Sequence, residues 1–323
     1  ANSYRDACRV FNAEQVNISN NRFRNILDDS IAISSNDTDA KKSNTINISD
    51  NVIIDSQGII TLGGKNVVIA NNVLQRVMHR AIRVGAGESF PTGNTAPLSI
   101  VITGNSVVDM FRGTTFSPNS GGYVRGIETY IETLAAKDTV ESGDPVVKPY
   151  PYLYTIDNDE AGVVNAGAYN TIISGNSVTR TLDATANYSD YGFGTRLSRS
   201  GYVNPQITLD DIQAEQFYLY HSGNGLLVSN NISSGALNAI NISPTKAANG
   251  VAFRNFKVSN NMLINYVGKG VNITGDGLVE VSSNVFDADP YHEHPNRNSN
   301  GSWGAGFAVS TGISLVSGTE LFS

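Results

Sequence analysis

The feature that most constrains the fold of this 323-residue sequence is a short repeat, seen clearly in residues 67–85, VVIANNVLQRVMHRAIRVG. Apolar residues alternate there with other residues, Asn71 and Asn72 interrupt the alternation, and it resumes through Ile82 and Val84. Alternation with a period of two indicates short strands, and asparagine is typical of the tight bends between them. The same pattern recurs around a column of aligned asparagines: Asn21, Asn51, Asn72, Asn105, Asn176, Asn231, Asn261 and Asn284.

The spacing of these copies predicts a solenoid. Asn51 and Asn72 lie 21 positions apart, and Asn261 and Asn284 lie 23 apart. A repeat of this length is typical of a parallel β-helix, in which each coil buries its apolar face only when neighbouring coils stack on it. Because parallel crossovers strongly favour the right hand, we expect an all-β, right-handed parallel β-helix. We expect a single domain over residues 1–323 that is a fragment of a longer chain.

Two columns of side chains are expected to build the coils. The asparagines would form a hydrogen-bonded ladder at the bend, where their side chains tolerate left-handed backbone. The strand before each asparagine would point one aliphatic residue into a continuous apolar stack, formed by Ile18, Ile48, Ile69, Ile102, Ile173, Val228, Val258 and Val281.

Composition excludes several classes of protein. The net charge of −7, with 29 acidic and 22 basic residues, argues against a nucleic-acid partner, which would need clustered Lys and Arg. The single cysteine, Cys8, rules out an internal disulfide and is expected to be a small buried hydrophobe. Since no run reaches the roughly 18 apolar residues of a membrane span, we expect no membrane insertion.

Long insertions interrupt the repeat in its middle part, near residues 88–99, 113–123, 132–170 and 183–213. Insertions on a solenoid usually lie on one face and form its binding site. The last two are rich in Tyr, Pro, Asp and Gly, as in KPYPYLYTIDNDE. Such tyrosines suit the C–H faces of sugar rings, whose hydroxyls bond to carboxylates and guanidinium groups, or they pack the loops against each other or a neighbouring subunit.

A second strand in each copy places chemistry beside these insertions. The segments SIAIS, GIITL, AIRVG, GIETY, QFYLY, AINIS and GVNIT superpose with Ile31, Ile59, Ile82, Ile127, Phe217, Ile240 and Val271 pointing inward. The next residues then point outward: Ala32, Ile60, Arg83, Glu128, Tyr218, Asn241 and Asn272. With Tyr130 and Tyr220 two positions further on, the middle coils present a patch of Arg83, Glu128 and three tyrosines, unless an extra coil lies between residues 128 and 218.

Two alternatives bear on that patch. Arg83 and Glu128 could form an ordinary salt bridge between rungs, which contributes up to about 1 kcal/mol when exposed. Another outward column, Asp55, Arg76, Asp109 and Arg180, alternates in charge and is expected to be a surface ladder.

The patch suggests glycan chemistry. Glycoside hydrolysis needs two carboxyl groups, and Glu128 is the first candidate. Candidates for the second are Glu132, Asp159 with its neighbours Asp157 and Glu160, or a residue of a neighbouring chain. A lyase would instead need a base and a cation that neutralises a uronate, for which Arg83 with Tyr218, His79 or His221 would serve.

No metal or other cofactor is expected. Asp37 with Asp39, and the cluster at residues 157–160, lack the spacing of a calcium-binding EF-hand loop. The run His292-Glu293-His294 lacks the helical spacing of a zinc site.

The repeats, the tyrosine-rich insertions and the stretch DADPYHEHPNRNSNGSWGAGF at residues 287–307 resemble bacteriophage tailspikes that degrade capsular polysaccharide, within the pectate-lyase-like β-helix class. The resemblance implies a homotrimer on the virion tail, acting outside the cell on bacterial capsular or exopolysaccharide. It implies an endo-acting hydrolase or lyase with its groove on the helix face or between subunits, but it assigns no catalytic residue. The function that we expect first is an endo-glycosidase. Its sugar-binding residues would be Arg83, Tyr130, Tyr218, Tyr220 and His221. The alternatives are a polysaccharide lyase and a non-catalytic glycan-binding adhesin or structural spike.

Overall fold

The computed structural model describes the repeats, and most of the insertions lie outside the described residues. The described residues are 6–26, 28–34, 43–86, 98–111, 124–131, 169–179, 214–219, 224–236, 238–242, 253–266, 269–274, 277–288, 311–316 and 319–322. They form 25 β-strands, and these ranges contain no helix. Every strand pairing between them is parallel, as each coil lies beside the next.

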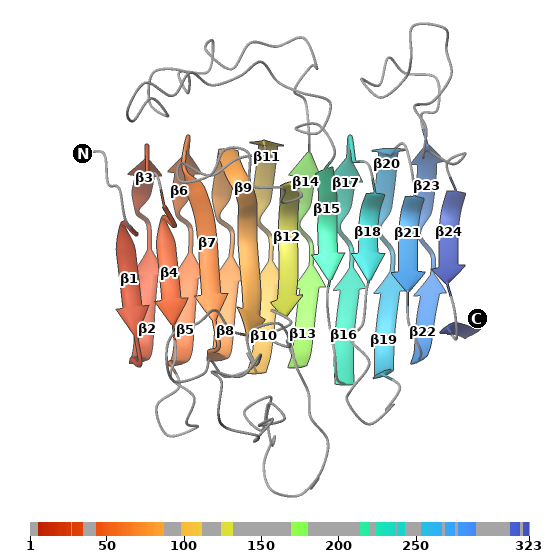
Figure 1. The fold of residues 1–323 in the computed structure, drawn as a ribbon, viewed down its shortest axis with the longest axis horizontal. Helices are drawn as coiled ribbons and strands as arrows, with labels where there is room; N and C mark the ends of the chain where they lie inside the picture. The colour runs from red at the N-terminus through yellow and green to blue at the C-terminus, as the bar shows by residue number, and fades with distance from the viewer. Residues whose placement is uncertain are drawn as a thin grey trace, which may run out of the picture.

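The strands form three ladders that run along the molecule (Figure 1). The first ladder comprises β2 (Glu14–Ser19), β5 (Asn44–Ser49), β8 (Lys65–Ala70), β10 (Leu98–Thr103), β13 (Tyr169–Ser174), β16 (Asn224–Ser229), β19 (Phe253–Ser259), β22 (Gly277–Ser282) and β25 (Thr319–Phe322). The second comprises β3 (Arg22–Arg24), β6 (Val52–Ile54), the start of β9 (Val73–Ala86), β11 (Ser106–Phe111), β14 (Ser177–Thr179), β17 (Ile232–Ser234), β20 (Met262–Tyr266) and β23 (Val285–Ala288).

The third ladder runs opposite in direction to the first, as the arrowheads in Figure 1 show. It comprises β1 (Cys8–Phe11), β4 (Ile31–Ser34), β7 (Gln57–Leu62), the end of β9, β12 (Val124–Ile131), β15 (Ala214–Leu219), β18 (Asn238–Ile242), β21 (Lys269–Thr274) and β24 (Thr311–Val316). The long strand β9 belongs to both the second and third ladders and joins them into one sheet. The described chain is therefore all-β, built of parallel sheets of short strands, an arrangement consistent with a β-helix or solenoid.

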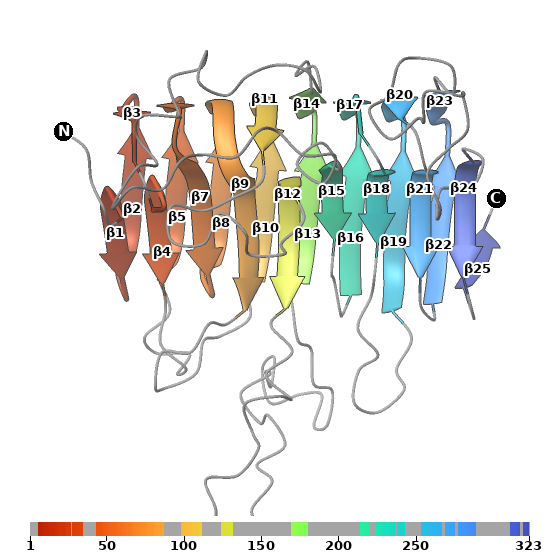
Figure 2. The ribbon, with the colours of Figure 1, turned by 45° about the horizontal axis from the view of Figure 1, so that its top comes forward.

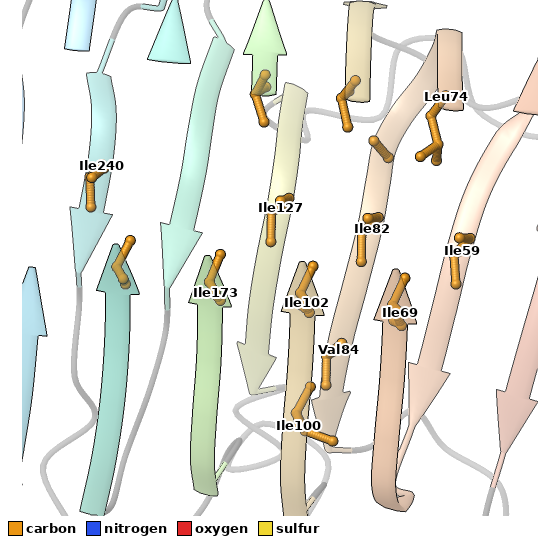
Figure 3. Packing of buried hydrophobic residues seen from close by; sticks show 14 of the residues in the cluster. Ile59, Ile69, Leu74, Ile82, Val84, Ile100, Ile102, Ile127, Ile173 and Ile240 are labelled. Carbon is orange, nitrogen blue, oxygen red and sulfur yellow. The ribbon is translucent and has the colours of Figure 1, made fainter. Parts of the chain in front are cut away.

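The inward aliphatic column is confirmed. Ile48 pairs with Ile69, Ile69 with Ile102, and Ile102 with Ile173, and all four side chains are fully buried. Figure 3 shows Ile69, Ile102 and Ile173 of the first ladder packed in the same interior as Ile59, Ile82 and Ile127 of the third. Cys8 packs against this core but is only half-buried, so the expectation of a buried cysteine was wrong.

The asparagine ladder is also confirmed. The backbone N–H and Nδ2 of Asn51 both donate to Oδ1 of Asn72, each at 3.0 Å, and Nδ2 of Asn72 donates to the carbonyl oxygen of Ile48 at 2.9 Å. The same bonds recur from coil to coil as far as Asn284. Each asparagine thus ties the bend of its own coil to the coils on both sides.

The left-handed backbone lies one residue earlier than expected. Positive φ occurs at the residue before each ladder asparagine, for example Asn71 at 56° and Gly104 at 66°. The ladder asparagines themselves do not adopt it. The chain reverses at the preceding residue, which leaves the asparagine side chain directed into the coil, where it can bond.

The pairing of strands also settles two expectations about the insertions. Glu128 of β12 pairs directly with Tyr218 of β15, so no extra coil lies between them.

Two insertion boundaries were wrong, because Leu98 and Ser99 belong to β10 and Tyr169 and Asn170 belong to β13. Ser99 and Asn170 have positive φ, and this local irregularity interrupts the alternation by which strands are predicted. Residues 88–97, 113–123, 132–168 and 183–213 lie outside the described residues.

Within the described chain, no helix is long and apolar enough to span a membrane.

Candidate functional site

The outward column of the third ladder has the register that the sequence predicted. Ile60 pairs with Arg83, Arg83 with Glu128, Glu128 with Tyr218, Tyr218 with Asn241, and Asn241 with Asn272. Figure 2 shows the strands that carry them, β7, β9, β12, β15, β18 and β21, side by side. Residues far apart in sequence therefore form one continuous row, which we call the outer row.

The chemistry of the outer row changes along the molecule. At its start, Ala32 and Ile60 form a small apolar cluster with Leu62. The charged residues Arg83 and Glu128 occupy the next two rungs. The tyrosine position follows, and then the amides of Asn241 and Asn272. Arg9, which pairs with Ala32, precedes this apolar cluster, and the other charged residues of the row lie on its middle rungs, next to the points where the insertions leave the coils.

Glu128 lies in an ion cluster with two arginines. Its Oε2 is 3.1 Å from Nε of Arg80 and 3.9 Å from Nε of Arg83. Glu128 is 0% exposed and Arg83 2%, whereas the side chain of Arg80 is 26% exposed. A carboxylate so removed from water is stable only when it is paired, and removing its partners would be costly. The prediction that these side chains face solvent was wrong, although their outward direction in the sheet was right.

Sequence reasoning missed Arg80. It lies where β9 departs from regular pairing, because Gln57 pairs with Met78 but Ile59 pairs with Ile82, so β9 contains two extra residues there. Arg80 pairs with Arg125 of β12, three positions before Glu128, and its side chain reaches Glu128 from there. A signal was present in the sequence, since the run His79-Arg80-Ala81-Ile82-Arg83 carries two arginines three positions apart.

A second carboxyl group, that of Asp29, interacts electrostatically with Arg80 and Arg83. Burial, reinforced by the nearby Asp28 and Asp6 carboxylates, raises the pKa of Asp29 to about 8, and Arg83 and Arg80 oppose this rise only in part. Asp29 lies just before β4 and is half-buried. Because its pKa lies above 7, Asp29 holds its proton at neutral pH. The Asp28-Asp29 pair directly before a strand was the signal that sequence reasoning overlooked.

Asp6, Asp28 and Asp29 form a compact acidic group. Oxygen atoms from the three residues lie within 4.8 Å of one another, and each residue is half-buried. Burial also raises the pKa of Asp6, an effect opposed by Arg9 at 3.7 Å. Carboxylates in this arrangement are the described residues best placed to hold a hard divalent cation, although Asp29 would first have to lose its proton.

The other predicted site residues have different outcomes. Tyr218 and Tyr130 occupy the predicted register positions, opposite Glu128 and Gly85, and only their backbone is described. His79 lies within β9, again with only its backbone described. Glu132, Asp159, Tyr220 and His221, together with Asp157 and Glu160, lie outside the described residues.

The charged column proposed as a surface ladder is only partly a surface feature. Nε of Arg76 is 2.6 Å from Oδ1 of Asp55, and Nη2 of Arg24 is 3.4 Å from its Oδ2. The Asp55–Arg76 pairing is confirmed, but Asp55 is buried. Asp109 is buried as well, and Arg180 lies outside the described residues.

No family model matches this sequence, and no curated protein matches it either.

Proposed function

We propose that this chain is the right-handed parallel β-helix of a bacteriophage tailspike, which cleaves bacterial capsular polysaccharide as an endo-glycosidase. The observation that carries the proposal is the cluster of Arg80, Arg83 and Glu128 in the middle of the outer row. Parallel crossovers favour the right hand, which supports the handedness. The proposed protein is a homotrimer on the virion tail, in which residues 1–323 form one domain.

Asp29 and Glu128 would divide the chemistry of hydrolysis. A glycosidase needs one carboxyl group that carries a proton near neutral pH and one that is ionised. The pKa of Asp29, about 8, suits the proton donor. The guanidinium groups around Glu128 suit an ionised carboxylate. Activity should then fall as the pH rises through about 8, where Asp29 loses its proton.

The separation of these carboxyl groups bears on the stereochemistry. Three rung spacings, about 14 Å, separate the backbones of β4 and β12, and Asp29 lies three positions before Ala32, the residue in register with Glu128. A separation of this size excludes the roughly 5 Å of a retaining pair and is nearer to the 6.5–9.5 Å or so of an inverting one. With this pair of carboxyl groups we therefore expect inversion. Retention would point instead to Asp29 working with Asp6 or Asp28, whose oxygens lie within 4.8 Å.

The deciding experiment compares Glu128→Gln with Glu280→Gln in a capsule depolymerisation assay. Glu280 is a partly exposed glutamate on the first ladder, paired with Lys257 at 2.7 Å, so it matches Glu128 in being ion-paired but lies away from the outer row. We expect a loss of about 100-fold or more for Glu128→Gln and no change for the control. A Glu128→Gln protein that melts like the wild type and keeps its activity would overturn the assignment of Glu128.

A polysaccharide lyase is the second candidate, favoured by the two arginines. A guanidinium binds a carboxylate through paired hydrogen bonds, so Arg80 and Arg83 suit the uronate group that β-elimination requires. Elimination creates unsaturated uronate ends that absorb ultraviolet light. Fragments released without a rise in absorbance exclude the lyase.

A non-catalytic glycan-binding adhesin or structural spike is the third candidate, favoured by the complete burial of Glu128. In that case the ion cluster staples neighbouring coils together. Binding to a capsule without release of reducing ends or smaller fragments, over a panel of capsule types, would favour this function.

A further inference from the structure

Beside the later part of the outer row, at the start of β21, lies a lysine that is hydrogen-bonded to an amide instead of paired with a carboxylate. Nζ of Lys269 donates to Oδ1 of Asn272 at 2.9 Å, and Nδ2 of Asn272 donates to Oδ1 of Asn241 at 2.9 Å. The backbone N–H of Lys269 donates to Oδ1 of Asn238 at 3.1 Å. These bonds fix both the backbone and the ammonium end of the lysine.

The positive charge of Lys269 is not neutralised by the described residues. None of the ion pairs among them includes Lys269. An ammonium has three N–H donors, and the bond to Asn272 uses one of them. The half-buried Lys269 therefore presents a fixed charge with donors left for a ligand.

Lys257, in the same coil, has the opposite environment. It lies on the first ladder, and its Nζ is 2.7 Å from Oε1 of Glu280. That pair also lowers the pKa of Glu280 through the hydrogen bond from Lys257. The same coil thus holds one lysine that is already paired with an acid and one that is held by neutral amides.

The position of Lys269 connects it to the proposed glycan site. Asn272 follows Glu128 in the outer row by three rungs, about 14 Å, with the tyrosine position and Asn241 between them. A polysaccharide lying along the row past Glu128 would reach Lys269. Asn241 and Asn272 are buried and bonded to each other, so they hold the ammonium in place, and it is the unneutralised ammonium that favours an anionic group.

We propose that Lys269, Asn272 and Asn241 form a subsite for a carboxylate-bearing sugar, so that the polysaccharide recognised by this face is acidic. This inference rests on the proposed function, because it extends the same face. In this subsite Lys269 pairs with the sugar carboxylate, and Asn272 holds the ammonium in place.

The test uses methyl β-D-glucuronide and methyl β-D-glucoside, which differ at C6, where one has a carboxylate and the other a hydroxymethyl group. Binding is followed by NMR on protein labelled with ¹³C-lysine, whose Cε signals report on each ammonium without changing its charge or its N–H donors. For the wild-type protein we expect the glucuronide to bind about tenfold more tightly, with a shift in the Lys269 signal and none in the Lys257 signal. Lys269→Gln should bring the ratio of the two dissociation constants to about one, whereas Lys257→Gln and Lys269→Arg should leave it near the wild-type value.

The outcomes separate this inference from the function on which it rests. A ratio that is unchanged in Lys269→Gln, or a wild-type protein whose Lys269 signal responds to neither sugar, overturns the subsite. Failure of the proposed enzyme shows itself elsewhere, as wild-type protein that releases no fragments from any capsule. A charge-selective Lys269 in a protein without depolymerase activity would support the subsite on a non-catalytic glycan-binding face.

Discussion

Asn105 and Asn176 are 71 residues apart in the sequence, yet the backbone N–H and Nδ2 of Asn105 both donate to Oδ1 of Asn176, at 3.0 and 2.9 Å. Nδ2 of Asn176 then donates to the carbonyl oxygen of Ile102 at 2.9 Å and to Oδ1 of Asn231 at 3.0 Å. The ladder thus crosses the longest interval between neighbouring asparagines with the same geometry as elsewhere.

Asn176→Ala should therefore be strongly destabilising. Oδ1 of Asn176 accepts two buried hydrogen bonds, and its Nδ2 donates to two buried acceptors, so alanine leaves the partners of all four bonds unsatisfied. Each buried polar group left unsatisfied costs about 1–3 kcal/mol. We expect the free energy of unfolding to fall by about 3 kcal/mol or more, measured by urea denaturation. Asn21→Ala is the matched control, since Asn21 is exposed and lies at the ladder end, and it should cost about 1 kcal/mol or less. Equal losses in the two variants would contradict the importance of the buried bonds.

The buried carboxylate of Asp55 gives a second prediction. Arg76→Ala removes its closer guanidinium, at 2.6 Å, and leaves Arg24 at 3.4 Å as the remaining arginine. We expect a loss of about 3 kcal/mol, because a buried charge that loses its partner is costly. The double variant Asp55→Asn with Arg76→Ala should recover part of that loss. A double-mutant cycle with additive effects would show that the two side chains are not coupled.

Gly58 should tolerate no side chain. A Cβ at this position would overlap the carbonyl oxygen of Ala81 in the next coil and lie 2.7 Å from that of Arg80. Backbone atoms cannot yield without separating the coils, so Gly58→Ala should cost about 3 kcal/mol or prevent folding. Gly312→Ala is the control, because its Cβ would meet Phe286 at an ordinary 3.5 Å. Melting temperatures of the two variants check this prediction, and similar values would count against it.

The raised pKa of Asp29 predicts how stability depends on pH. The ordinary pKa is 3.8 and the folded value about 8, so between these values the folded state holds a proton that the unfolded state releases. The free energy of unfolding should consequently fall as the pH rises through this interval and level off above about 8. The slope is at most about 1.4 kcal/mol per pH unit for one proton, and the partial exposure of Asp29 to solvent narrows the pH interval over which it applies.

Asp29→Asn should flatten this dependence, because asparagine stays neutral at every pH. Thermal melting at pH 5, 7 and 9 measures the effect. Glu280→Gln is the control: Lys257 lowers the pKa of Glu280, so its titration lies below this range. Parallel pH profiles for wild type and Asp29→Asn would show that Asp29 does not carry the proton.

Much of the fold could be predicted because its elements repeat. The alternation around Ile48 and Ile69 and the recurrence of the asparagines gave the strands, the inward column and the register of Arg83 with Glu128. The errors fell where the backbone departs from the repeat, at the positive φ of Ser99 and Asn170 and at the two extra residues of β9. Periodicity carries no information about such local irregularities.

The candidate site was less predictable, because its contacts join residues that belong to no common pattern. Register placed Arg83 beside Glu128, but Arg80 pairs with Arg125 and reaches Glu128 only through the direction of its side chain. Asp29 comes under the influence of Arg83 although it lies in an earlier coil. Whether an outward side chain meets water also depends on what packs over it, and no strand pattern encodes that.

The sequence by itself determined the parallel stacking and the asparagine ladder, because both follow from local features repeated in every coil. Only the tertiary structure decided that Glu128 is buried between two arginines, that Asp29 keeps its proton at neutral pH, and that Lys269 is held by amides while Lys257 is paired with Glu280. The physical reason is that hydration and ion pairing depend on the positions of side chains from several coils at once. A repeat fixes which residues are neighbours, and the full packing around them fixes their charge and exposure.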